Sequence, residues 1–77
     1  MSWNYRVLAF DEHPEVVLKV CEVYYNKEGV PDGYKEDTNF STTEGIAGLK
    51  FLLSKYKNAL IKPILFAGDK FPQEYLK

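Results

Sequence analysis

The sequence predicts an α+β fold, in which a three- or four-stranded antiparallel sheet packs against one amphipathic helix. Two patterns predict this β-β-β-α order. Residues 16–25 are a long β-branched and aromatic run followed by a turn signal, as expected for a strand of a hairpin. Apolar residues then recur at spacings of three and four from Ile46 to Leu60, which indicates a helix. A chain of 77 residues has room for a single core, so we expect residues 1–77 to form one domain.

The first strand is expected over residues 3–10, followed by a polar loop over residues 11–15 in which Pro14 removes a hydrogen-bond donor. A loop centred near His13 places odd-numbered residues of both strands on one face, and we expect the helix to cover that face. That face would hold Trp3, Tyr5, Val7, Val17, Cys21, Val23 and Tyr25. The opposite, half-polar face is left for a partner, and it would hold Asn4, Arg6, Leu8, Phe10, Val16, Leu18, Val20, Glu22 and Tyr24. A single bulge would exchange the two faces.

The second strand, residues 16–25, is predicted to be central because apolar residues occupy both of its faces. Residues 26–29 fit a type I turn that is closed by Gly29 in the left-handed region. Residues 30–36 are then expected to return as a third strand. We place this strand at an edge of the sheet, because Pro31 cannot donate a hydrogen bond to a ladder.

The helix is predicted to begin with a capping box, in which Ser41 and Glu44 satisfy backbone amides. Pro63 ends the helix, and residues 64–66 are expected to add a short strand before an aromatic C-terminal tail. One stripe of the helix is expected to face the sheet, and it consists of Ile46, Leu49, Leu52, Leu53, Tyr56 and Leu60.

Charge and composition restrict the function. Ten basic and eleven acidic residues give a net charge of −1, which makes nucleic acid an unfavoured partner. No apolar segment approaches the length needed to span a bilayer, so we expect no membrane association. The start of the chain lacks the pattern of a signal peptide and Cys21 is the single cysteine, which together predict a cytoplasmic protein.

The sequence carries no signature of an enzyme. Asp11, Glu12 and His13 place two carboxylates beside the single imidazole, a combination that can perform acid–base chemistry. We predict a solvated loop instead, because no serine or cysteine nucleophile and no second histidine accompany them. One histidine and one cysteine cannot complete a common zinc site, so we expect no metal and no cofactor.

Three segments of the sequence are similar to segments of a known protein family. They are residues 3–6 (Trp-Asn-Tyr-Arg), residues 22–25 (Glu-Val-Tyr-Tyr) with the turn that follows, and residues 70–75 (Lys-Phe-Pro-Gln-Glu-Tyr). In these segments the chain resembles a family of small uncharacterised bacterial proteins. The resemblance implies a bacterial or phage source and a compact β-β-β-α fold, and it implies no catalytic residues.

These observations predict a non-catalytic protein-interaction module that binds a partner protein, or a second copy of itself, through the remaining sheet face and the aromatic tail. A narrower hypothesis is a phage or mobile-element inhibitor of a host defence complex. The alternative is a small nucleic-acid-binding protein that uses its sheet tyrosines and basic residues. We expect Arg6 and Glu22 to pair across strands and orient the partner, with aromatic contact area from Tyr24, Phe71 and Tyr75.

Overall fold

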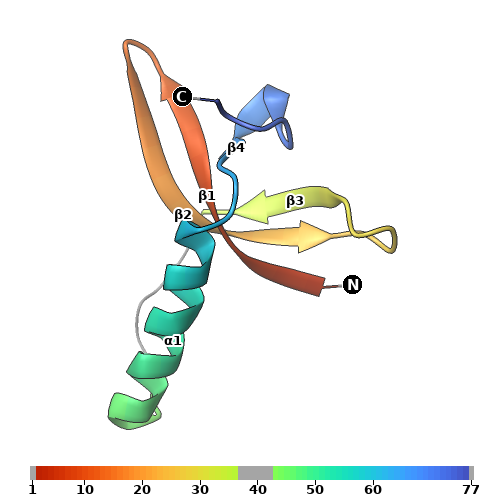
Figure 1. Ribbon diagram of the computed structural model, residues 1–77. Coiled ribbons are helices and arrows are strands. Elements are labelled where there is room, and N and C mark those ends of the chain that lie inside the picture. The colour runs from red at the N-terminus through yellow and green to blue at the C-terminus, as the bar shows by residue number, and fades with distance from the viewer. Residues whose placement is uncertain (1, 37–42, 77) are drawn as a thin grey trace.

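The computed structural model describes residues 2–36 and 43–76, which form a curled four-stranded sheet and one α-helix (Figure 1). The strands are β1 (Ser2–Glu12), β2 (Glu15–Tyr25), β3 (Pro31–Lys35) and β4 (Leu65–Phe66), and the helix is α1 (Gly45–Leu60). A short 3-10 turn, η1 (Gly68–Lys70), follows β4. The sheet order is β3-β2-β1-β4, so β2 lies between two neighbours as predicted. The α+β class is confirmed.

The loop between β1 and β2 is shorter than expected, and this changes the faces of the sheet. Glu12 pairs with Glu15, so the connection is only His13 and Pro14, and Arg6 lies opposite Cys21. The expected loop over residues 11–15, centred on His13, is therefore wrong. The loop has two residues instead of the expected five. This change from an odd to an even number shifts the register by one residue, so every β2 side chain lies on the opposite face, relative to β1, from the one expected.

The turn between β2 and β3 agrees with the prediction. The Gly29 amide donates to the Asn26 carbonyl at 3.0 Å, and the Asn26 side-chain oxygen accepts from the amides of Glu28 and Val30, also at 3.0 Å. Gly29 has a φ of +80°, in the region that glycine adopts without steric cost. Among the described strands β3 lies at the end of the sheet, next to β2, which confirms that the strand containing Pro31 lies at an edge.

Helix α1 projects from the sheet, with its C-terminal end beside the strands and its N-terminal end away from them (Figure 1). Ser41 of the expected capping box lies outside the described residues. Glu44 occupies the N-cap position without a side-chain capping hydrogen bond, so its predicted place in the first turn of the helix is wrong. The helical stripe was expected to face the sheet throughout, and this is wrong for half of its members. Leu49, Leu52 and Tyr56 are partly buried, whereas the remaining members are exposed: Ile46, Leu53 and Leu60.

The second face of the sheet is covered by the C-terminal part of the chain. β4 pairs with β1 in parallel, so the sheet is mixed rather than antiparallel. A parallel neighbour is reached because the chain returns through α1 before it pairs with β1. Residues 64–75, which we call the C-terminal cover, contribute Leu65 to the core and pack Ala67 and Phe71 against it. The β1 side chains expected to be free for a partner, such as Arg6 and Leu8, thus face a core that also contains Cys21, Val23 and Leu65. Val16 and Leu18, which were expected on the same face, lie on the opposite one and are 41% and 48% exposed.

Candidate functional site: exposed apolar surfaces of the helix

The five residues predicted to bind a partner do not form one surface. Glu22 lies opposite Tyr5 and Arg6 opposite Cys21, so Arg6 and Glu22 point to opposite faces. The predicted Arg6–Glu22 pair is therefore wrong. Glu22 instead accepts a hydrogen bond from the Tyr24 hydroxyl at 2.7 Å, and this bond to a carboxylate raises the pKa of Tyr24.

Arg6 is an interior residue with only 9% of its surface exposed. Its Nη1 donates to the Tyr25 hydroxyl at 2.8 Å, and that hydroxyl donates to the Asn4 side-chain oxygen at 2.8 Å. Its Nη2 donates to the Pro63 carbonyl at 2.7 Å. Arg6 thus connects β1 to the chain just beyond α1.

The tail aromatics hold the C-terminal cover in place. The Phe71 ring lies 4.8 Å from the Tyr34 ring, and the Tyr75 ring lies 5.2 Å from the Phe66 ring. The amide of Gly68 donates to the Tyr34 hydroxyl at 2.8 Å. These contacts join β3 to the cover within one chain. Partner binding by Phe71 and Tyr75 stays a prediction.

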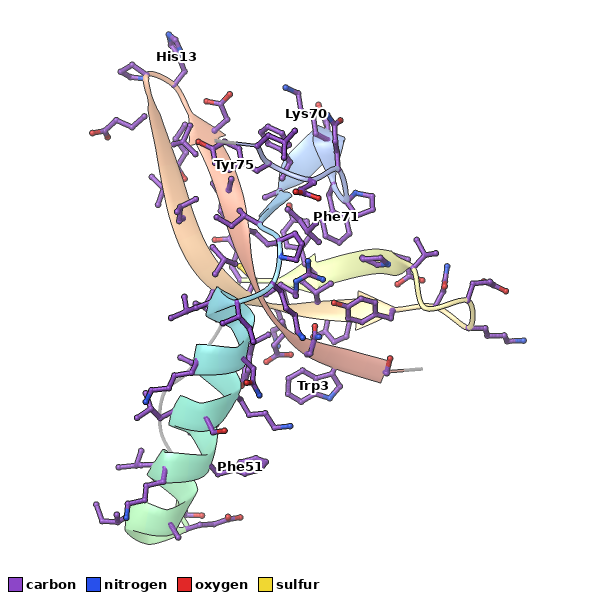
Figure 2. The ribbon with its side chains drawn as sticks, in the orientation of Figure 1. Trp3, His13, Phe51, Lys70, Phe71 and Tyr75 are labelled. Atoms are coloured by element: carbon purple, nitrogen blue, oxygen red, sulfur yellow. The ribbon has the colours of Figure 1, made fainter. Side chains whose placement is uncertain are left out.

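A first apolar surface is the cleft between β1 and α1. Trp3 is 54% exposed and Phe51 is 62% exposed, and both project into the space between the N-terminal end of β1 and the helix (Figure 2). The Trp3 ring packs edge-on against the Tyr5 ring at 5.3 Å, and Tyr5 packs against Tyr56 of α1 at 4.8 Å. We call this 300 Å³ space the aromatic cleft, and its lining is Trp3, Asn4, Tyr5, Phe51, Leu52 and Lys55.

A second apolar surface runs along another side of α1. We call it the outer stripe, and it consists of Ile46, Leu49, Leu53 and Leu60. Ile46 and Leu60 are each 67% exposed and Leu53 is 45% exposed. Residues 46, 49, 53 and 60 fall at a and d positions of a coiled-coil heptad. Leu49 is partly buried, and the d position between Leu53 and Leu60 is Tyr56, which packs against Tyr5. A groove of about 310 Å³ lies beside Leu53, and it is lined by Lys50, Leu53, Ser54, Lys57 and Asn58.

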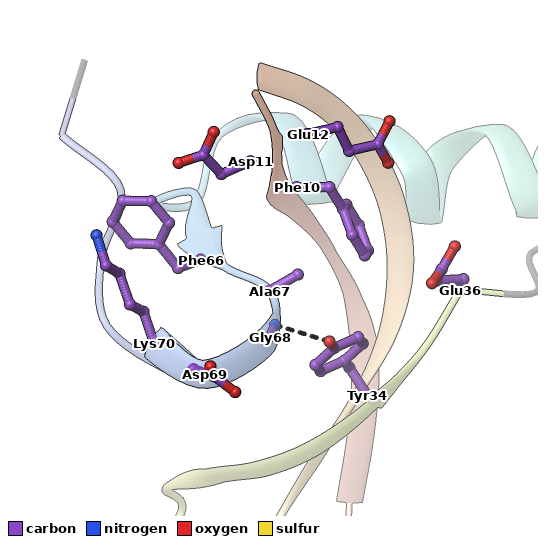
Figure 3. Close-up of a pocket in the computed structure, with 10 residues that line it drawn as sticks. All are labelled: Phe10, Asp11, Glu12, Tyr34, Glu36, Phe66, Ala67, Gly68, Asp69 and Lys70. Carbon is purple, nitrogen blue, oxygen red and sulfur yellow. Dashed lines mark hydrogen bonds between the residues drawn. The ribbon is translucent and has the colours of Figure 1, made fainter. Parts of the chain in front are cut away.

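A polar pocket of about 450 Å³ lies between the end of the β1–β2 hairpin and η1 (Figure 3). Its lining mixes aromatic rings with carboxylates: Phe10, Asp11, Glu12, Tyr34, Glu36, Phe66, Ala67, Gly68, Asp69 and Lys70. The chain's own ammonium groups already lie on two of the rings, with Lys19 Nζ 4.6 Å from the centre of Phe10 and Lys70 Nζ 4.7 Å from the centre of Phe66. Lys19 also bonds Glu36 at 3.2 Å, which raises the pKa of Lys19. The pocket is therefore partly filled and neutralised from within the chain.

His13 lies at the exposed tip of the hairpin (Figure 2). The Cys21 thiol is buried, and desolvation raises its pKa to about 11, which keeps it protonated and unreactive. Within residues 2–36 and 43–76, no three His, Cys, Asp or Glu side chains are grouped so that they could hold a metal ion.

The prediction from sequence did not identify Trp3 and Phe51 as exposed residues. The helix sequence could have indicated this exposure. Its apolar residues cover more than one side of the helix, and a single sheet can bury only one side. Glu22 and Tyr24, which were predicted, share the sheet face of Trp3 and Tyr5 next to the aromatic cleft.

Comparisons with protein-family models, curated proteins and solved structures find no match to this chain. In the part of the chain that the structure describes, no helix has the length and apolar character needed to cross a membrane.

Proposed function

We propose that the protein is a non-catalytic interaction module that binds a partner protein through helix α1. The observation that supports this most is the exposure of large apolar side chains on two sides of one helix, in the aromatic cleft and along the outer stripe. Scattered apolar residues are ordinary on a protein surface, whereas a contiguous set marks an interaction site. Fully covering one such side chain contributes about 1.5–3 kcal/mol, so a partner that covers several would bind stably.

We keep Glu22 and Tyr24 in this site because their sheet face borders the aromatic cleft. Arg6, Phe71 and Tyr75 have partners inside the chain, which favours a role for them in holding the fold. The narrower hypothesis of a phage or mobile-element inhibitor of a host defence complex is one form of this function and stays a prediction.

The alternative, nucleic-acid binding through sheet tyrosines, has weaker support. Stacking on bases requires open ring faces. Tyr34 packs between Phe10 and Phe71, and Tyr5 packs between Trp3 and Tyr56. A phosphate-binding surface would also lose affinity steeply as salt rises, which a fluorescent single-stranded oligonucleotide tests directly.

The test is affinity purification of partners from a lysate of the native host, with the full chain as bait. Leu53→Asp and Phe51→Asp each place a carboxylate on an exposed side of α1, and we expect both variants to lose a partner that the wild type retains. Val30→Asp is the matched control, because Val30 is 48% exposed and Leu53 45%, and Val30 lies at the β2–β3 turn. Equal recovery of every protein by wild type, Leu53→Asp and Phe51→Asp would contradict the proposal.

A further inference from the structure

The charge of α1 bears on what could cover its outer stripe. Between Gly45 and Leu60 the sequence has three lysines and neither aspartate nor glutamate. The whole chain has a net charge of −1, so positive charge is concentrated on this helix. Its N-terminal turn also lacks an acidic residue. A partner surface that meets α1 therefore meets positive charge over residues 50–57 and no acidic side chain between Gly45 and Leu60.

Two of these lysines border the outer stripe. Lys50 and Lys57 line the groove beside Leu53, one helical turn before it and one turn after it. Among the residues that the structure describes, the ion pairs within 4.0 Å both belong to Lys19, so neither Lys50 nor Lys57 has a carboxylate at that distance. The third lysine, Lys55, lies 5.1 Å from the centre of the Phe51 ring and faces the aromatic cleft.

A second copy of the chain is a poor occupant for this surface. An antiparallel pair of α1 helices centred near Leu53 would place Lys50 of each copy near Lys57 of the other, and a parallel pair would place like lysines together. Either pairing brings Lys50 and Lys57 from each helix into one seam, with no acidic residue from the helices to offset them. Like charges at the flanks of a helix pair oppose association.

We propose that the outer stripe binds an acidic amphipathic helix of another protein. Leu53 and its heptad neighbours Ile46, Leu49 and Leu60 would pack against apolar residues of that helix, while glutamates or aspartates beside them would pair with Lys50 and Lys57. Spacing selects a helix as the occupant, because residues at heptad intervals meet a partner that repeats with the same period. The inference rests on the proposed function and names the chemistry of the partner.

The test uses two synthetic amphipathic peptides with leucine at every a and d position. One carries glutamate at the flanking e and g positions and the other carries lysine there. Charge repulsion therefore opposes self-association of both peptides to a similar extent. Binding of the labelled peptides to the full chain is followed by fluorescence anisotropy at low and at physiological salt. We expect the glutamate peptide to bind about tenfold more tightly, because its carboxylates attract Lys50 and Lys57 where the lysine peptide repels them. The preference should shrink as salt rises.

Charge reversal at the stripe supplies the second readout. The double variant Lys50→Glu/Lys57→Glu should reverse the preference and bind the lysine peptide more tightly. Lys27→Glu/Lys35→Glu is the matched control, because it makes the same change in net charge at two exposed lysines outside α1 and should retain the wild-type preference. Leu53→Asp should weaken the binding of both peptides.

Each other outcome overturns the inference. If the two peptides bind equally and Leu53→Asp abolishes this binding, the stripe binds apolar helices without a preference for acidic ones. That result would contradict this inference but not the proposed function. A dimer in sedimentation that Leu53→Asp dissociates would show that a second copy is the occupant. Binding to phosphatidylserine vesicles but to neither peptide would identify a lipid surface. Binding to neither peptide and to no vesicle would also overturn it, with the lysate experiment then deciding the proposed function separately.

Discussion

Arg6 places a guanidinium in the interior of the protein, where it donates to the Pro63 carbonyl and to the Tyr25 hydroxyl. Among the described residues its Nε has no hydrogen-bond partner. A single ammonium group cannot reproduce two hydrogen bonds that diverge from one planar group.

We therefore expect Arg6→Lys to lower the free energy of unfolding by about 1–2 kcal/mol, because one buried acceptor loses its charged donor. Urea denaturation followed by far-UV circular dichroism measures this change. An unchanged midpoint would show that Arg6 does not hold α1 to the sheet, and would return it to the list of candidate partner-binding residues.

Cys21 gives the stability of the protein a predicted dependence on alkaline pH. Burial raises the pKa of the thiol from its ordinary 9.0 to about 11. Between these values the folded chain keeps a proton that the unfolded chain has released. The contribution of Cys21 to the free energy of unfolding is therefore fully present below pH 9 and decreases as pH rises toward 11.

The control for this prediction is Cys21→Ala, which has no thiol to titrate. We expect wild type to lose more stability than Cys21→Ala between pH 9 and pH 11, and the two to change in parallel between pH 6 and pH 8. Thermal unfolding over the pH series measures both. Parallel curves across the whole range would contradict a buried, protonated thiol.

At the scale of single elements, the two turns show where local sequence is sufficient. The turn at residues 26–29 follows from its own residues, since Asn26 and Gly29 supply the hydrogen bonds and the backbone conformation that it needs. The connection at His13 and Pro14 does not. Flanking Asp11, Glu12 and Glu15 are polar and suggest a longer loop, yet they lie in the strands because cross-strand pairing continues to Glu12 and Glu15.

Gly29 is the position where the β2–β3 turn is most sensitive to substitution. A Cβ at Gly29 meets nothing within 4 Å, so the cost of Gly29→Ala comes from its φ of +80° alone. We expect a loss of about 1 kcal/mol in the free energy of unfolding.

Gly33→Ala is the matched control in the adjoining strand. Its added Cβ would lie 3.9 Å from Tyr24 Cδ2, an ordinary contact, and Gly33 is not among the glycines with positive φ. We expect Gly33→Ala to leave the urea midpoint unchanged or to raise it slightly, because alanine restricts the unfolded chain. Equal effects of the two substitutions would mean that backbone conformation does not govern this turn.

At the scale of the whole molecule, the C-terminal cover packs on the face of the sheet that α1 does not contact. Leu65 joins the core directly, and Phe71 packs against it from the edge. The amide of Ala67 donates to the Ala9 carbonyl at 2.9 Å, which continues the pairing with β1. Losing the cover would expose a core that contains Leu8, Cys21 and Val23.

We accordingly expect a chain that ends after residue 63 to lose cooperative unfolding, because a small domain has little stability to spare. A chain that ends after residue 75 should unfold like the full protein, since Leu76 is exposed. Differential scanning calorimetry distinguishes the two. A cooperative transition in the shorter chain would show that β1–β3 and α1 form a stable fold without the cover.

The strand order β-β-β-α, the edge position of β3, the tight turn at Gly29 and the existence of α1 were all contained in the sequence, because each depends on residues close to one another in the chain. The face assignment of β2, the parallel pairing of β4 and the burial of Arg6 were decided by tertiary structure. The face assignment depends on whether the β1–β2 loop has an odd or an even number of residues, and the other two features depend on contacts between segments far apart in sequence. The spacing of apolar residues in α1 predicted a single stripe against the sheet, and only the packed structure decided that Ile46, Leu53 and Leu60 of that stripe are left exposed.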